Sequence, residues 1–386
     1  MDSGLPKQLR ILFLGNIAPY RIGGAEVQAR WLCECFARRG HQVAIASYSV
    51  PDGRIRAGKT SDRIIETIHL PIVAANRLVR IATFCISMLK LLLVRKGDFD
   101  LVFCCSFKDA TLVVALLKRL DILKLPVVVR CEGFGVSGDA RFLKALPATR
   151  WFVHLSNKTI DRVNSIAPRI QNELTSLGLK PGLFCYIPNG VPLPPVQKPV
   201  PFPNHGPRSI LFAGRMVPKK GASDLLLAAK ELMRRGAEFR VNLVGAGPLS
   251  EYLKYQARLL GIDTRIRFHG LVDPDQMPCF YRDNHFLVLP SLQEPFGMVA
   301  VEAMSHGRPV VVTRSGGPEY YVDRLVGRVC PAGDVFALAD AMQEMIDMPL
   351  AALQEMGLKA RERVEARFNI EDTSNRFLEL FYEVAL

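Results

Sequence analysis

Short apolar runs of high β propensity alternate with helix-forming segments along the whole 386-residue chain. Because parallel strands require long crossover connections, this alternation predicts parallel sheets covered by helices. An amphipathic helix is expected over residues 25–39. The expected strands are residues 10–14, 43–46, 101–104, 127–131, 151–155 and 185–188, then 209–213, 240–244, 286–290 and 309–313. The length suits about two ordinary domains, and the pattern restarts near residue 208, so we expect two doubly wound domains.

A proline-rich stretch separates the two series of strands. Residues 191–203 contain six prolines, which exclude a helix interior and a central strand. We therefore expect an N-terminal domain over residues 1–195, a linker region over 196–207 and a C-terminal domain over 208–366. The last segment, 367–386, is expected to form a helix with an apolar side that packs on either domain.

Charge is distributed unequally between the halves. The net charge is +13, and residues 1–200 hold 28 Lys and Arg against 14 Asp and Glu, so the first half is +14 and the rest −1. This asymmetry favours two domains with different partners. A nucleic-acid-binding protein would show basic clusters interleaved with aromatic residues, and no such module is visible.

An apolar segment in the basic half has two open interpretations. Residues 78–94 are flanked or interrupted by five cations, namely Arg77, Arg80, Lys90, Arg95 and Lys96. The segment is either an amphipathic element on an anionic membrane surface or an ordinary crossover helix. Its longest apolar run, 81–94, is too short to span a bilayer.

The cysteine pattern indicates reduced thiols. Nine cysteines are an odd number, and none has C-x2-C spacing. No secretory signal is visible, so a cytoplasmic protein is expected, peripheral to the membrane if the apolar segment binds there.

The most informative motif follows the expected strand 286–290. There Glu294 precedes Pro-Phe-Gly and a helix start, and Glu302 lies eight residues further, about 12 Å of helical rise away. Ligands of open α/β folds bind at this edge of the sheet, and the amides of Gly297, Met298 and Val299 are suited to an anion. The alternative is that Glu294 only complements the helix N-terminus, with Glu302 a solvated or buried acid.

Two further loops follow strands of the second half. Gly214-Arg215 and Lys220-Gly221 bring cations to the end of strand 209–213, which suits a diphosphate or else is a solvated loop. Gly245 and Gly247 follow strand 240–244, but Ser250 takes the place of a third glycine, which disfavours a dehydrogenase. In the first half, Gly23 and Gly24 open a helix and either approach a phosphate or form a simple turn.

Together these motifs resemble those of the family 4 glycosyltransferases. The order and spacing match in Gly214-Arg215 with Lys220-Gly221, Gly245-x-Gly247-Pro248, Phe268-x-Gly270, Leu289-Pro290-Ser291, Glu294-x7-Glu302, Gly307-x-Pro309 and Gly316-Gly317-x-Glu319. Ile187 to Val191 and Gly23 to Glu26 also match. The likeness is most specific over residues 208–330.

This resemblance implies the GT-B fold, with two Rossmann-like doubly wound parallel-sheet domains facing a central cleft and the last helix returning to the first. It implies a retaining, metal-independent glycosyltransferase of the hexosyl type, with no cofactor and a UDP- or GDP-sugar as donor. A glycan or glycolipid acceptor, lipid-linked or part of the cell envelope as in polysaccharide biosynthesis, is expected in the basic half.

The resemblance also implies roles for single residues. Arg215 and Lys220 would neutralise the diphosphate, helped by the amides after Phe296 and by the loop of Gly23 and Gly24. Glu294 would hold the sugar and Glu302 the ribose. The base would be read near Gly270 and Leu271, with Gly245 and Gly247 also on the donor side.

The acceptor side is less clear. Many relatives carry a histidine after the strand equivalent to 127–131, whereas this chain has Glu132, either contacting a hydroxyl or pairing with Arg130. Glu26 and His154 are further acceptor-side candidates, although His154 in the expected strand 151–155 also suits a core or cleft-wall position. The competing functions are a GT-B-like nucleotide-sugar epimerase and a basic nucleic-acid-binding protein.

Overall fold

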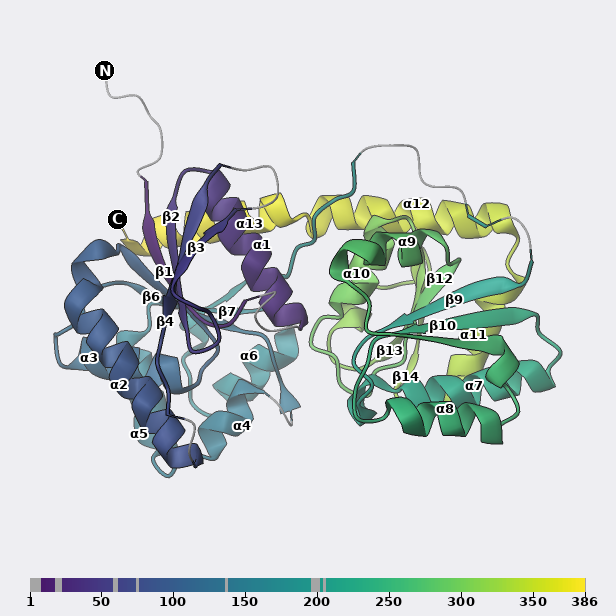
Figure 1. Ribbon diagram of the computed structural model, residues 1–386, viewed down its shortest axis with the longest axis horizontal. Coiled ribbons are helices and arrows are strands. Elements are labelled where there is room, and N and C mark those ends of the chain that lie inside the picture. The colour runs from purple at the N-terminus through teal and green to yellow at the C-terminus, as the bar shows by residue number, and fades with distance from the viewer. Residues whose placement is uncertain are drawn as a thin grey trace, which may run out of the picture. The chain divides into compact units, whose positions relative to one another are not determined.

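A computed structural model describes residues 8–17, 23–57, 62–73, 76–135, 138–195, 202–203 and 206–385, without the side chains of Arg77 and Leu78. The chain divides into two α/β units (Figure 1). The first comprises Met1–Gly190 with Ile370–Leu386, and the second comprises Val191–Asn369. The first unit therefore ends five residues before the expected boundary at 195. Most of the expected linker, 196–201 and 204–205, lies outside the described residues.

The first unit is built on an eight-stranded sheet in the order β3-β4-β2-β1-β5-β6-β7-β8. All neighbours are parallel except β3 and β4, which are antiparallel. The strands are β1 (Arg10–Leu14), β2 (Gln42–Ser47), β3 (Gly53–Arg56), β4 (Ile64–His69), β5 (Leu101–Cys105), β6 (Val127–Cys131), β7 (Arg162–Ser165) and β8 (Phe184–Tyr186). β3 and β4 were not expected from the sequence.

Seven α-helices of the described chain belong to this unit. They are α1 (Gly24–Arg38), α2 (Arg77–Arg95), α3 (Asp109–Arg119), α4 (Asp139–Lys144), α5 (Thr149–Thr159), α6 (Pro168–Thr175) and α13 (Ile370–Ala385). Helix α13 enters the core of this unit through two aromatic side chains. Phe377 lies 5.3 Å from Phe103 of β5, and Phe381 lies 5.5 Å from Phe36 of α1, between ring centroids. The C-terminal segment thus completes the hydrophobic core of the first unit.

The prediction of a strand at residues 151–155 was wrong. This segment belongs to α5, and the strand of this region is the more polar β7. Phe152, Leu155, Ser156 and Thr159 are buried at helical spacing, while Trp151 is exposed. A run of five mostly apolar residues does not by itself distinguish a buried strand from one side of a helix.

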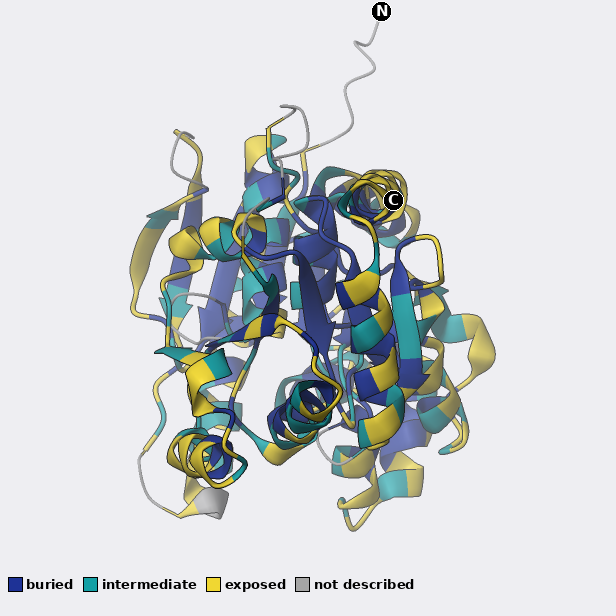
Figure 2. Cartoon of the chain, turned by 90° about the vertical axis from the view of Figure 1, so that its right-hand side faces the viewer, coloured by how far each residue is buried: buried dark blue, intermediate teal, exposed yellow. Residues whose placement is uncertain are grey.

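The second unit has a six-stranded, wholly parallel sheet in the order β11-β10-β9-β12-β13-β14. Its strands are β9 (Arg208–Ala213), β10 (Phe239–Val244), β11 (Ile266–Gly270), β12 (Phe286–Leu289), β13 (Val310–Arg314) and β14 (Gly327–Pro331). Its helices are α7 (Ala222–Arg234), α8 (Ser250–Leu259), α9 (Met277–Arg282), α10 (Met298–Ser305), α11 (Val335–Asp347) and α12 (Leu350–Arg367). The central strands are largely buried, and the helices other than α10 have exposed residues on one side (Figure 2).

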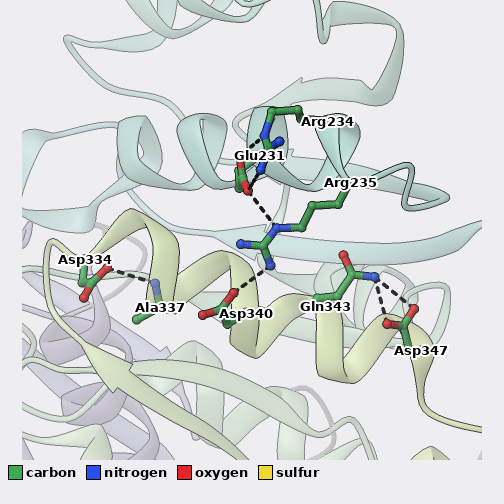
Figure 3. Close-up of polar contacts among 8 residues, drawn as sticks. All are labelled: Glu231, Arg234, Arg235, Asp334, Ala337, Asp340, Gln343 and Asp347. Carbon is green, nitrogen blue, oxygen red and sulfur yellow. Dashed lines mark hydrogen bonds and ion pairs between the residues drawn. The ribbon is translucent and has the colours of Figure 1, made fainter.

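Helices α7 and α11 pack together in this unit and are joined by an ion-pair network (Figure 3). Arg235, directly after α7, bonds to Glu231 at 2.8 Å and to Asp340 of α11 at 2.7 Å. Arg234 also pairs with Glu231, and both hydrogen bonds lower the pKa of that carboxyl to about 2. The opposite charges of the two packed helices therefore balance one another at this surface.

The buried Asp139 in the first unit predicts a pH-dependent stability. Its Oδ1 accepts the backbone N–H of Phe107 at 2.9 Å, and burial raises the pKa of the carboxyl to about 6. The folded protein therefore binds this proton more tightly than the unfolded chain does, so this group contributes stability below pH 4 that is lost as pH rises to about 6.

We expect the wild type to lose about 1–3 kcal/mol relative to Asp139→Asn between pH 4 and pH 6.5, because two pKa units correspond to about 3 kcal/mol at most. Chemical denaturation of both proteins across this range measures the difference. Parallel pH profiles of the two proteins would contradict the prediction.

Candidate active site

The expected donor-side residues follow adjacent strands of the second sheet. Because all of these strands are parallel, their carboxyl ends lie at one edge of the sheet. Along that edge, in the order β11, β10, β9 and β12, come Gly270, then Gly245 and Gly247, then Arg215 and Lys220, then Glu294. From β9 the chain continues to β10 and β11 on one side, and from β12 it continues to β13 and β14 on the other side. This pair is the topological switch point, where open α/β sheets bind ligands.

An ion pair between Lys220 and Glu294 joins the loops at this switch point. The Lys220 ammonium donates to Glu294 Oε2, and Ser291 Oγ donates to the same oxygen at 3.3 Å. Glu294 is only 7% exposed. The structure thus brings together two of the three predicted catalytic residues.

The backbone of these two loops is packed closely enough to require glycine at one position. Gly221 has φ 68°, and a Cβ there would lie 1.9 Å from the carbonyl oxygen of Pro290. The amide of Leu292 donates to the Lys219 carbonyl at 2.9 Å. These contacts hold Lys220 opposite Glu294.

Positive charge is concentrated on the loop after β9. Arg215 is exposed there, and Lys219 is half-buried beside it. Burial, followed by repulsion from Lys220 and Arg215, lowers the pKa of Lys219. The loop is therefore suited to a polyanionic ligand.

The segment from Glu294 to the start of α10 is held by the loop after β13. The amide of Glu294 donates to the Ser315 carbonyl at 3.1 Å, and Tyr321 Oη donates to the Phe296 carbonyl at 2.6 Å. Gly297 precedes α10, whose first residues are Met298 and Val299. The N-terminus of this helix, where anions are stabilised, thus starts four residues after Glu294.

Glu302 has a partner that the sequence did not indicate. Its carboxylate accepts a hydrogen bond from Tyr281 Oη, on α9. Burial raises the pKa of Glu302, an effect that this hydrogen bond opposes. The two residues lie 21 positions apart on different helices, so no local pattern connects them.

The glycines after β10 have a packing role. Gly245 has φ 123°, and a Cβ there would lie 1.9 Å from the Gly214 carbonyl oxygen. A Cβ on Gly247 would lie 2.5 Å from the Met216 carbonyl oxygen. The two glycines therefore let this loop lie against the loop that carries Arg215.

The end of β11 presents backbone at the same edge. Gly270 has φ 69°, its carbonyl accepts the Gly245 amide at 2.7 Å, and Leu271 after it is 69% exposed. This geometry leaves the peptide groups around Leu271 at the surface.

In the first unit, Glu132 and Arg130 form an ion pair at 2.7 Å at the carboxyl end of β6. The Arg130 guanidinium is buried, also donates to Asn189, and lies 5.1 Å from the ring centroid of Phe377. Burial raises the pKa of Glu132, and Arg130 opposes that shift. The alternative of a pairing with Arg130 is thus observed, and Glu132 keeps 16% side-chain exposure.

The remaining candidates of this unit lie on helices or directly before one. Gly23 is the N-cap of α1, Gly24 is its first residue, and the Glu26 carboxylate lies next to Gly23. Residues 18–22 before them lie outside the described residues. His154 is exposed on α5, so the expectations of a strand and of a core side chain were wrong for this residue.

Comparison with known proteins shows the relationship. The family model for "Glycosyl transferases group 1" matches residues 195–363, and the model for "Glycosyl transferase 4-like domain" matches 23–190. The chain belongs to the family 4 glycosyltransferases. The resemblance stated from the motifs is thereby confirmed, and so is the GT-B fold class.

Individual relatives of this glycosyltransferase match along nearly its full length. A glycogen synthase of Mycobacterium tuberculosis is 27% identical, over 94% of this chain and 91% of that protein. The sucrose-phosphate synthase of Thermosynechococcus elongatus has the same fold, with TM-score 0.78 and 21% identity over 97% of this chain and 99% of that one. Anabaena HepE, solved in complex with UDP-glucose, has a TM-score of 0.76 and 19% identity, over 97% of this chain and 100% of that one.

The packing around the glycines predicts that replacing them with alanine destabilises this glycosyltransferase by different amounts. Gly245→Ala is expected to lower the free energy of unfolding by about 3 kcal/mol or more, because it combines positive φ with a backbone clash. Gly261→Ala is the matched control, since Gly261 has φ 66° but nothing within 4 Å of a Cβ. It should cost only about 1 kcal/mol. Equal losses in urea denaturation would contradict this account.

Proposed function

We propose that this glycosyltransferase moves a hexose from a UDP- or GDP-sugar to an acceptor hydroxyl, with retention of configuration and without a metal ion. The observation that carries the proposal is the Lys220–Glu294 pair at the switch point, beside Arg215 and the N-terminus of α10. The family relationship supports it, and the complex of HepE with UDP-glucose shows a donor of this class in a protein of the same fold.

In this proposal Arg215 and Lys220 stabilise the leaving diphosphate. Breaking the bond between the anomeric carbon and the diphosphate oxygen places negative charge on that oxygen, and preorganised cations stabilise it. The grouping of Arg215, Lys219 and Lys220 supplies the positive charge that a metal ion would otherwise provide. This grouping is the support for metal independence.

Glu294 and Glu302 hold the donor's hydroxyl groups in this proposal. Binding of the diphosphate at Lys220 draws the ammonium away from Glu294, whose carboxylate then accepts from sugar hydroxyls. Glu302, aligned by Tyr281, accepts from the ribose. The exposed peptide groups around Gly270 and Leu271 read the base.

The environment of Glu294 supports the proposed same-face course. With the donor bound, the Glu294 carboxylate accepts from Ser291 Oγ and from the sugar hydroxyls, so it is a weakened nucleophile, which disfavours a covalent glycosyl-enzyme. The acceptor oxygen instead bonds to the anomeric carbon on the face that the diphosphate leaves. Its proton passes to the departing phosphate oxygen.

A substitution of Glu294 tests the donor site. We expect Glu294→Ala to lower kcat by about 100-fold or more with UDP- or GDP-sugars, since preorganised polar contacts at a transition state have effects of this size. The control is Glu355→Ala, an exposed glutamate of the same unit, which should match the wild type. Failure of the wild type to bind any nucleotide sugar, with Glu294→Ala indistinguishable from it, would refute the function.

We also propose that α2 docks on an anionic membrane surface, bringing the enzyme to a lipid-linked or cell-envelope glycan acceptor. The helix buries Met88, Leu91 and Leu92 and leaves other apolar residues exposed. These exposed residues are Val79, Ile86, Leu89, Leu93 and Val94. In the described part of the chain, no helix is long and apolar enough to span a bilayer.

Some cations on and after α2 already have partners within the protein and are therefore less available to lipid headgroups. Arg95 pairs with Glu66 at 2.8 Å and Asp98 at 2.7 Å, and Lys96 donates to the Ile122 carbonyl. Arg80 and Lys90 are exposed on the helix. Exposed apolar side chains with cations among them favour insertion at an anionic interface.

Sedimentation with vesicles containing phosphatidylglycerol tests this surface. Ile86→Ser with Leu93→Ser should reduce the bound fraction several-fold, and Lys90→Gln should remove much of its salt sensitivity. The control, Leu259→Ser, changes an exposed leucine of the second unit and should bind like the wild type. Unchanged binding of the double variant would contradict the docking surface.

A further inference from the structure

An extra residue interrupts the pairing of β10 with β11. Leu243 pairs with Phe268 and Val244 pairs with Gly270, so His269 has no partner position on β10. Such bulges redirect the chain that follows, and they are frequent beside functional sites. Here the chain that follows is Gly270 and Leu271.

A chain of side-chain hydrogen bonds holds the His269 ring. Asn284 Nδ2 donates to the Phe280 carbonyl at 2.8 Å, Asn242 Nδ2 donates to Asn284 Oδ1 at 2.8 Å, and His269 Nε2 lies 2.9 Å from Asn242 Oδ1. The Phe280 ring also packs edge-on against the His269 ring, with centroids 4.9 Å apart.

The direction of every bond in this chain is determined by its first member. A carbonyl oxygen only accepts, so the Phe280 carbonyl orients the Asn284 amide with its oxygen toward Asn242. Asn242 must then donate to Asn284 and present its own oxygen to His269. The imidazole therefore carries hydrogen on Nε2 and acts as the donor.

Burial holds in place the end of the hydrogen-bonded chain at Asn284. Asn284 is 2% exposed and follows α9, so it is fixed by the core, while Gly270 and Leu271 are exposed at the edge strand β11. The hydrogen-bonded chain thus connects a rigid part of the unit to an exposed turn. Gly270 is held on its other side by the amide of Gly245.

We propose that His269 and Asn242 are positioning residues that set the backbone of Gly270 and Leu271 for the base of the donor nucleotide. The inference rests on the proposed function, in which these peptide groups read the base. A turn held in its binding conformation before the ligand arrives loses less entropy on binding. The network therefore contributes to nucleotide affinity and leaves the chemical step to Lys220 and Glu294.

The test compares His269→Leu with His269→Gln, because glutamine places an N–H donor near the position of Nε2 and leucine has none. Calorimetry gives the Kd of UDP and GDP, and initial rates with the preferred nucleotide sugar give KM and kcat. We expect His269→Leu and Asn242→Leu to raise Kd and KM about 3- to 10-fold, the equivalent of one neutral hydrogen bond, with kcat within about twofold. His269→Gln should stay within about twofold of the wild type.

Gln343→Leu is the matched control. It removes a side-chain amide that donates to Asp347 on α11 in the same unit (Figure 3), and it should leave Kd unchanged. Asn242→Leu interrupts the hydrogen-bonded chain at a second residue. It therefore provides the test if His269→Leu does not fold.

Three results would overturn the inference: unchanged Kd in folded His269→Leu and Asn242→Leu, a Gln variant as weak as the Leu variant, or a loss confined to kcat. Failure of the proposed function has a different outcome, since the wild type itself would then bind neither UDP nor GDP.

Discussion

The candidate donor site depends on one ion pair, between Lys220 and Glu294 at the switch point of the second sheet. The two residues lie 74 positions apart and leave neighbouring parallel strands whose connections run in opposite directions. Only at that point do two strand ends open without a crossover between them. A buried carboxylate there needs a cation, and in the proposed function a diphosphate competes for the same cation. Under that proposal the Lys220–Glu294 pair both compensates a buried charge and supplies the cation for the ligand.

Close backbone packing supports this pair. Gly221 lies against Pro290, and Gly245 lies against Gly214, at distances that no Cβ permits. Gly245 is also a predicted donor-side residue. The packing of the two glycines brings three loops together, so that side chains after β9 and β12 converge. The first unit uses a related device, because Gly190 leaves room for Ile370 at the start of α13. Phe377 of that helix then lies beside the guanidinium of Arg130, which in turn holds Glu132.

Much of the fold was predictable because parallel strands are buried on both faces and read as apolar runs. Most interior strands of both sheets, and the motifs at their carboxyl ends, were found in this way. Five strands were missed, namely β3, β4, β7, β11 and β14. Three of them, β3, β11 and β14, lie at sheet edges, where polar residues weaken the pattern, and β7 is itself polar. The strand prediction for residues 151–155 was wrong for the opposite reason, since an apolar run on a helix resembled a strand. His154, which was expected on that strand, lies on α5 instead.

By itself the sequence determined the α/β architecture, through its alternating strands and helices, and the family, through the motifs that resemble it. It also identified Arg215, Lys220, Glu294 and Glu302 as candidate site residues, because they lie in motifs that follow strands. It did not determine which of them touch. Only the tertiary structure paired Glu302 with Tyr281 and joined His269 through Asn242 to Asn284. Hydrogen bonds between residues distant in the chain leave no periodicity, and their partners are decided by which strands and helices become neighbours.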